Sequence, residues 1–206
     1  MSVAKEPPYR HGTAPRTAVL LVNLGTPEAP DTPSLRRYLG QFLSDSRVVE
    51  IPKLIWKPIL HGIILRVRPR KSAEKYASIW MPEGSPLRYW TERQTKRVEG
   101  SLGERGHQLV IRHAMRYGQP SVGGVLSDLK AHCVNRVLVV PMYPQYSGAT
   151  TASVMDEVFR WGLNTRLIPE IRHINHFHDD PAYIAARAAS VREHWHWEAR
   201  TPTGIK

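Results

Sequence analysis

The sequence has a single cysteine, Cys133, among its 206 residues. One cysteine cannot form a disulfide within the chain, and it excludes a metal site built only from thiolates. Cys133 stands just before an apolar run, so we expect a buried side chain that behaves as a small hydrophobe. A lone free cysteine fits a reducing compartment.

Long hydrophobic runs are also missing. Residues 1–16 are polar and rich in proline, without the apolar core that a signal peptide requires. No stretch reaches the about 20 apolar residues of a membrane span. We therefore expect a disordered tail over residues 1–16 and a cytoplasmic location. The 41% hydrophobic composition nevertheless suffices for an α/β core and excludes a fully disordered chain.

Acidic residues are scarce beside basic ones, with 18 Asp and Glu against 29 Lys and Arg and a formal net charge of +11. Such a surface attracts polyanions, anionic membranes or acidic small molecules, and charge alone does not choose among them. The sequence has no nucleic-acid recognition motif, which disfavours a nucleic-acid-binding module. Steeply salt-dependent binding of DNA or RNA would reveal such a module.

Four short apolar runs predict strands that are covered by helices on both faces. Helix-length segments separate these strands, which predicts βαβ units and an open parallel four-stranded sheet, a Rossmann-type α/β fold. The expected strands cover residues 17–23, 108–113, 135–142 and 169–174. The expected helices cover residues 33–43, 54–67, 87–102, 121–132 and 152–163, and a last helix begins at Asp180–Pro181 and runs to about Trp195.

Three loop motifs directly follow expected strands: NLGTP (23–27), MRYG (115–118) and MYPQYSGATT (142–151). Ligands of open α/β sheets bind beyond the carboxyl ends of the strands, so these loops are candidates for a pocket. Gly25 permits a close turn there, and Thr26 can hydrogen-bond a ligand or the next loop. The long helical insertion that follows the first strand is placed to form a wall of the pocket.

A basic stretch, RVRPRKS (66–72), precedes Tyr76, Trp80 and the Gly84-Ser85-Pro86 turn. Cations suit carboxylates, and aromatic rings suit a flat macrocycle. The alternative is a solvated run of charges beside a helix start, and without further context the residues favour that alternative.

The segment HINHFHDD (173–180) invites a metal-site interpretation. In an extended chain, however, Asn175, Phe177 and Asp179 face away from His176 and His178. An exposed strand-to-helix turn also tolerates histidines freely, so we favour an ordinary turn.

Taken together and in order, five segments over residues 17–195 closely resemble bacterial ferrochelatases: AVLLVNLGTPEAP, RPRKSAEKYASIW with GSPLRYWT, MRYG, VLVVPMYPQYSGATTASV and FHDDPAYIAA. The resemblance implies a lyase that inserts Fe²⁺ into protoporphyrin IX in the last step of heme biosynthesis. It also implies two similar chelatase-like α/β domains, with the porphyrin in the cleft between them.

The resemblance places porphyrin contacts or pocket-lining positions at several residues, with either arginine of the basic stretch near the propionates. These residues are Leu24, Arg68, Arg70, Tyr76, Ser85, Arg116, Tyr117 and Tyr143. The apolar helix 54–65 would form the lip of the cleft and touch a membrane, or be an ordinary buried helix face. Gly148 occupies the position of a cysteine that binds a [2Fe-2S] cluster in some members, so we expect no cluster or other cofactor.

The family's catalytic histidine lies in a segment resembling S-F-H-G-x-P or S-A-H-S-L-P, which this sequence lacks. We therefore expect no catalytic residue and no metal ligand in this chain, a second domain that is missing or truncated, and little activity. The alternative is a fragment that binds porphyrin without inserting metal. The expected organisation is a tail (1–16), an N-terminal domain (17–178) with a helical insertion (28–105), a crossover helix (179–196) and a tail unlike the family (197–206). The oligomeric state stays open.

Overall fold

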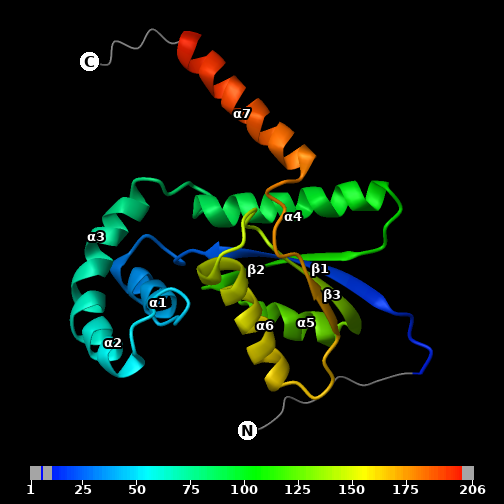
Figure 1. The fold of residues 1–206 in the computed structure, drawn as a ribbon, viewed down its shortest axis with the longest axis horizontal. Coiled ribbons are helices and arrows are strands. Elements are labelled where there is room, and N and C mark those ends of the chain that lie inside the picture. Colours follow the sequence, from blue (N-terminus) through cyan, green and yellow to red (C-terminus); the bar gives the residue numbers. More distant parts are fainter. Residues whose placement is uncertain (1–5, 7–10, 201–206) are drawn as a thin grey trace.

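The computed structural model describes residue 6 and residues 11–200 (Figure 1). At its centre is one sheet of four parallel strands in the order β2-β1-β3-β4, as the sequence predicts. Each strand contains most of an expected apolar run. The strands are β1 (Arg16–Gly25), β2 (Val110–Tyr117), β3 (Val134–Pro141) and β4 (Glu170–His173).

Helices cover both faces of this sheet, with α4 on one face and α5 and α6 on the other (Figure 1). Helices α1 to α3 form a separate group beside the sheet, and α7 extends away from it (Figure 1). The helices are α1 (Thr32–Leu43), α2 (Lys53–Ile59), η1 (Leu60–Ile64), α3 (Leu65–Ala77), α4 (Pro86–Glu104), α5 (Val122–Ala131), η2 (Gly148–Ala152), α6 (Ser153–Leu163) and α7 (Pro181–Arg200).

Strand β1 shows why helices must cover both faces of the sheet. Its alternate residues Ala18, Leu20 and Val22 are fully buried in the core beneath α5 and α6. Val19 and Leu21 point the other way and belong to the smaller core beneath α4. Because successive side chains of a strand point to opposite faces, a continuous apolar run can be buried only between two helical layers.

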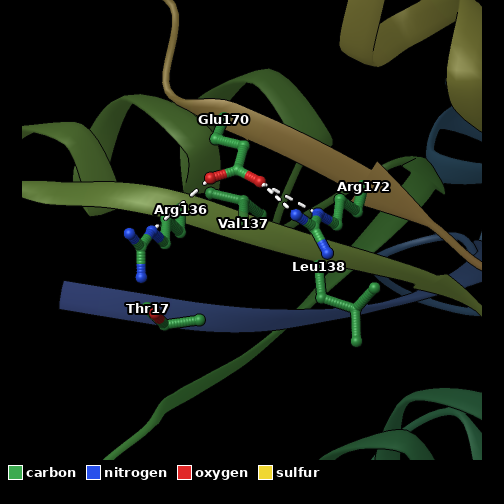
Figure 2. Close-up of a pocket in the computed structure, with 6 residues that line it drawn as sticks. All are labelled: Thr17, Arg136, Val137, Leu138, Glu170 and Arg172. Carbon is green, nitrogen blue, oxygen red and sulfur yellow. Dashed lines mark hydrogen bonds and ion pairs between the residues drawn. The ribbon is translucent and has the colours of Figure 1, made fainter. Parts of the chain in front are cut away.

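Helix α4 packs on β2 and β1 and leaves part of its sheet face open over β3 and β4. Figure 2 shows this region, where Glu170 lies between Arg136 and Arg172, with ion-pair distances of 3.5 and 2.8 Å. These side chains line a shallow pocket of about 390 Å³ together with Thr17 and Leu138. The open part of the face is therefore charged at its β4 edge.

The helical stretch that was expected over residues 54–67 is longer in the structure and runs from Lys53 to Ala77. Helices α2, η1 and α3 follow one another without a break, and a π-helical turn separates the two α-helices. Pro58 and Pro69 lie inside these helices, and each removes one backbone donor. The basic stretch 66–72 therefore lies within α3, where the sequence analysis placed only the end of a helix.

Cys133 corrects an expectation. It is exposed and has a φ of 60°, because it forms the tight turn between α5 and β3. Its backbone N–H donates to the Lys130 carbonyl oxygen at 3.0 Å, so turn geometry overrides the burial that its apolar neighbours suggested.

The two ends of the chain are described only in part. Of the expected tail 1–16, residues 1–5 and 7–10 lie outside the described residues, while Glu6 pairs with Lys130 at 2.5 Å and Arg16 already belongs to β1. Helix α7 continues to Arg200, past the expected end. Within the described ranges, no helix is both long enough and apolar enough to cross a membrane.

Gly25 provides a test of the contact between β1 and β2. It has a φ of +107°, and a Cβ atom there would stand 1.8 Å from the Tyr117 carbonyl oxygen. Gly106 has a similar φ of +82° but nothing within 4 Å. Gly106→Ala should cost about 1–2 kcal/mol of unfolding free energy from backbone strain alone. Gly25→Ala adds a backbone clash and should cost clearly more, as measured by urea denaturation; equal losses would contradict this close contact.

Candidate functional site

The carboxyl end of β1 is fastened to the turn that precedes α4. The Thr26 hydroxyl donates to the Ser85 hydroxyl at 2.7 Å, and both side chains are buried. The Asn23 amide donates to the Thr91 hydroxyl on α4 at 3.1 Å. The NLGTP and GSPL motifs are thus joined into one structure, and Thr26 bonds the neighbouring loop, one of the two partners that the sequence allowed.

An aromatic cluster lies beside this junction. The ring of Tyr38 meets that of Tyr76 edge to face at 6.4 Å, and Phe42 meets Tyr117 in the same way at 5.2 Å. The half-buried Leu24 packs against the same cluster. Three predicted residues therefore meet here from β1, α3 and β2, whereas Tyr38 and Phe42 of α1 were not predicted, because they resemble ordinary core positions of a helix.

The buried phenols near this edge stay protonated at neutral pH. Burial raises the pKa of Tyr117 to about 12 and raises the pKa values of Tyr38 and Tyr143 as well. The Tyr143 hydroxyl is buried and has no hydrogen-bond partner within the described part of the chain. These groups can donate hydrogen bonds, but they cannot serve as proton acceptors near pH 7.

Arg116 and Tyr117 bind a carboxylate of the chain itself. One oxygen of Asp45 accepts hydrogen bonds from Arg116 at 2.7 Å, from Tyr117 at 2.7 Å and from Ser153 at 2.6 Å. The Nε of Arg116 also donates to the Ser153 hydroxyl at 2.7 Å. The side chains of Arg116 and Asp45 are only 10% and 6% exposed. The donors of Arg116 are thus engaged within the protein. The resemblance placed Arg116 and Tyr117 at porphyrin-contacting or pocket-lining positions, and both line a pocket of about 390 Å³ together with Gln41 and Glu157.

The charge state of Asp45 follows from these contacts. Burial by itself raises its pKa, but the hydrogen bonds from Ser153, the Arg47 backbone and Tyr117, together with the Arg116 charge, lower it below the usual value. Asp45 is therefore a carboxylate at neutral pH, and Arg116 is its buried counter-ion.

The two arginines of the basic stretch differ in position. Arg68 is four and eight residues before the half-buried Ser72 and Tyr76, so it shares their side of α3. Arg70 lies on another side and approaches Glu74 at 3.9 Å, with its side chain 85% exposed. Both arginines are exposed, and helix periodicity places Arg68 nearer than Arg70 to the side of α3 that carries Tyr76.

The segment after β3 borders a pocket of about 400 Å³. Tyr146 and Thr151 line it from this segment, Arg47 from the loop after α1, and His173 and His176 from the end of β4 onward. Thr151 is fully buried, and its hydroxyl has no hydrogen-bond partner among the described residues. The expected ligand loop thus contributes to a pocket, and the half-buried Tyr143 packs against the edge of the main core.

Comparisons with known proteins match most of the chain. The family model described as Ferrochelatase matches residues 16–203, and so reaches into the segment 197–206 that the sequence analysis set apart. The ferrochelatases of Methylibium petroleiphilum and Polaromonas sp. are 61% and 59% identical to the chain, each over 95% of it and 54% of the relative. That of Dechloromonas aromatica is 60% identical over 92% of the chain and 52% of the relative. The chain spans about half the length of these curated relatives.

Removing the Asp45 carboxylate should destabilise the fold strongly. Asp45→Ala leaves the Arg116 charge buried without its main partner, which costs about 3–5 kcal/mol of unfolding free energy. Asp156→Ala is a matched control, because Asp156 pairs with Arg47 at 2.6 Å in a half-exposed position. Removing this ion pair should cost about 1 kcal/mol of unfolding free energy or less. Urea denaturation measures both, and equal small losses would contradict a structural role for the buried pair.

The same carboxylate predicts an acid dependence. Because the pKa of Asp45 is lower in the folded than in the unfolded chain, its stabilisation is complete above the unfolded value of about 3.9 and is lost as the pH falls toward the folded value. The difference in unfolding free energy between the wild type and Asp45→Ala should therefore shrink from neutral pH to pH about 3. A difference that stays constant would contradict the lowered pKa.

Proposed function

Because this chain belongs to the ferrochelatase family, we propose that it forms the porphyrin-binding part of a metal-inserting lyase. That enzyme converts protoporphyrin IX and Fe²⁺ to protoheme in the last step of heme biosynthesis. The observation that carries the proposal is the meeting of Leu24, Tyr76 and Tyr117 at the carboxyl edge of the sheet, where open α/β folds bind ligands.

The proposed contacts divide into two groups. Leu24, Tyr76 and Tyr143 offer apolar and aromatic surface to the ring, and Arg68 offers its guanidinium to a propionate. Ser85, Arg116 and Tyr117 are engaged in hydrogen bonds within the protein, so we assign them the role of holding these surfaces in place.

Metal insertion must remove two pyrrole protons, which requires a base close to the ring. Histidine is the natural base near neutral pH, and the buried tyrosines of this chain are unsuited because their pKa values are raised. Residues 1–206 lack the family's histidine segment. We therefore assign this chain the binding wall, and the base and metal ligands to the part of the relatives that it does not match.

The proposal includes no iron–sulfur cluster. Gly148 offers no thiolate at the position of the cluster cysteine, and Cys133 lies at the opposite end of β3. The substrates are thus protoporphyrin and ferrous iron, without a resident cofactor.

Arg68 and Arg70 allow a matched test of porphyrin binding. Arg68→Ala should weaken protoporphyrin binding about tenfold or more, because a charge-assisted hydrogen bond contributes about 1.5–3 kcal/mol. Arg70→Ala, on the same helix, should leave the affinity unchanged. Titration followed by porphyrin absorbance measures both, and equal effects would contradict the assignment of Arg68 to a propionate.

Binding and insertion can be separated with the 206-residue chain. With protoporphyrin and Fe²⁺ under anaerobic conditions, we expect a shift in the porphyrin absorbance without the spectrum of protoheme. Insertion at the rate of a full-length relative would contradict the assignment of the base to another segment. An absence of any shift would contradict porphyrin binding by this chain.

We extend the proposal to peripheral contact with the cytoplasmic face of a membrane. The segment from residue 51 to residue 67 exposes apolar side chains, with Leu54 92% exposed. Basic residues flank them, which is the pattern of a helix that lies on an anionic lipid surface. The exposed apolar residues are Ile51, Leu54, Ile55, Ile59, Ile63 and Val67.

Leu54→Asp tests this contact. It places a charge in the apolar patch and should reduce co-sedimentation with vesicles of anionic phospholipid several-fold. Leu163→Asp is the control, because Leu163 is 84% exposed but lies on α6, and it should bind vesicles like the wild type. Equal binding by all three proteins would contradict a membrane role for this patch.

A further inference from the structure

The turn between β4 and α7 brings three metal-binding side chains together. Residues 178 and 179 form a turn that is closed by a hydrogen bond from the Asp180 N–H to the Phe177 carbonyl oxygen at 3.3 Å. The strand-like alternation expected for this segment is therefore wrong beyond Phe177. Asp179 folds back toward His176, with 3.8 Å between its Oδ1 and the histidine Nδ1.

The ligating atoms of His176, His178 and Asp179 all lie within 4.8 Å of one another. The two imidazole rings are 5.1 Å apart, centroid to centroid. Ligands around a tetrahedral metal ion stand at about 2.0–2.2 Å from it. These exposed side chains would rotate to bring their ligating atoms to that distance from a common ion.

The backbone of this segment is fixed on both sides of the cluster. The Phe177 N–H donates to the Pro144 carbonyl oxygen at 2.9 Å, and the Phe177 ring packs edge to face on Tyr183 at 5.7 Å. The Asp180 carboxylate accepts from the N–H groups of Ala182 and Tyr183 at the start of α7. Asp180 is thus occupied as a helix cap, while its neighbour Asp179 remains available.

The three side chains also have few other commitments. All three are exposed, and the hydrogen bonds and ion pairs of the described residues engage them only in the His176–Asp179 contact. His173 differs, because its Nε2 is hydrogen-bonded to the Asn175 side chain at 3.0 Å. A metal ion would therefore gain three ligands without breaking a buried interaction.

We propose that His176, His178 and Asp179 bind one divalent transition-metal ion of the Zn²⁺ or Co²⁺ type. Two imidazoles and one carboxylate match the ligand preference of these ions, whereas Mg²⁺ and Ca²⁺ prefer oxygen ligands throughout. Three protein ligands leave a fourth position for water or another exchangeable group. This site needs no porphyrin, so it stands or falls separately from the proposed function.

Titration of the 206-residue chain with Zn²⁺ alone, followed by calorimetry, tests the proposal. We expect one site in the wild type and an affinity at least about tenfold lower in His176→Ala and in His178→Ala, since each removes a direct ligand. His173→Ala, a few residues upstream, is the matched control and should keep the wild-type affinity. Co²⁺ in place of Zn²⁺ should give visible absorption bands that disappear in His178→Ala.

Two results would overturn the site. One is the absence of Zn²⁺ binding to the wild type under these conditions. The other is a double variant, His176→Ala with His178→Ala, that binds Zn²⁺ as tightly as the wild type. Circular dichroism of each variant should match the wild type, because the substituted side chains are exposed, and a loss of affinity then reports on ligation.

Discussion

The arrangement of the sheet's carboxyl edge depends on the carboxylate of Asp45. It lies after α1 and receives hydrogen bonds from the end of β2 and the beginning of α6. Burying two opposite charges is costly, and it becomes tolerable only because the remaining donors and acceptors are also paired. Three elements distant in the sequence are thereby held in one position, with Phe42 against Tyr117 and hence α1 against the sheet.

Close backbone contacts complete this edge. A Cβ atom at Gly118 would stand 2.8 Å from the Thr26 carbonyl oxygen. The backbone N–H of Gly118 donates to the Gln41 side-chain oxygen at 2.8 Å. Thr26 in turn reaches Ser85. The loops at the proposed porphyrin-binding edge are thus fastened to each other and to α1, which favours binding by a preformed surface.

Strands β1 and β3 were predictable because each is a continuous run of Val and Leu that must be buried on both faces, whereas β4 is short, charged and largely exposed. The helical state of residues 68–72 was not predictable, because Pro69 and the dense charge resemble a loop. The packing of Ala73 and Tyr76 against α1 stabilises the helix instead. The role of Arg116 was hidden because its partner Asp45 lies 71 residues away in the sequence. The family resemblance supplied the positions of Leu24 and Ser85, which neither periodicity nor composition could single out.

Strand β4 has only four residues and forms one border of the sheet. Unpaired strand borders are sites where other chains can add a strand, and this one carries the alternating charges of Glu170 and Arg172 beside Arg136. A foreign strand would find few backbone groups to pair with and would have to desolvate these ions. A short, charged border of this kind therefore disfavours edge-to-edge association between copies of the domain.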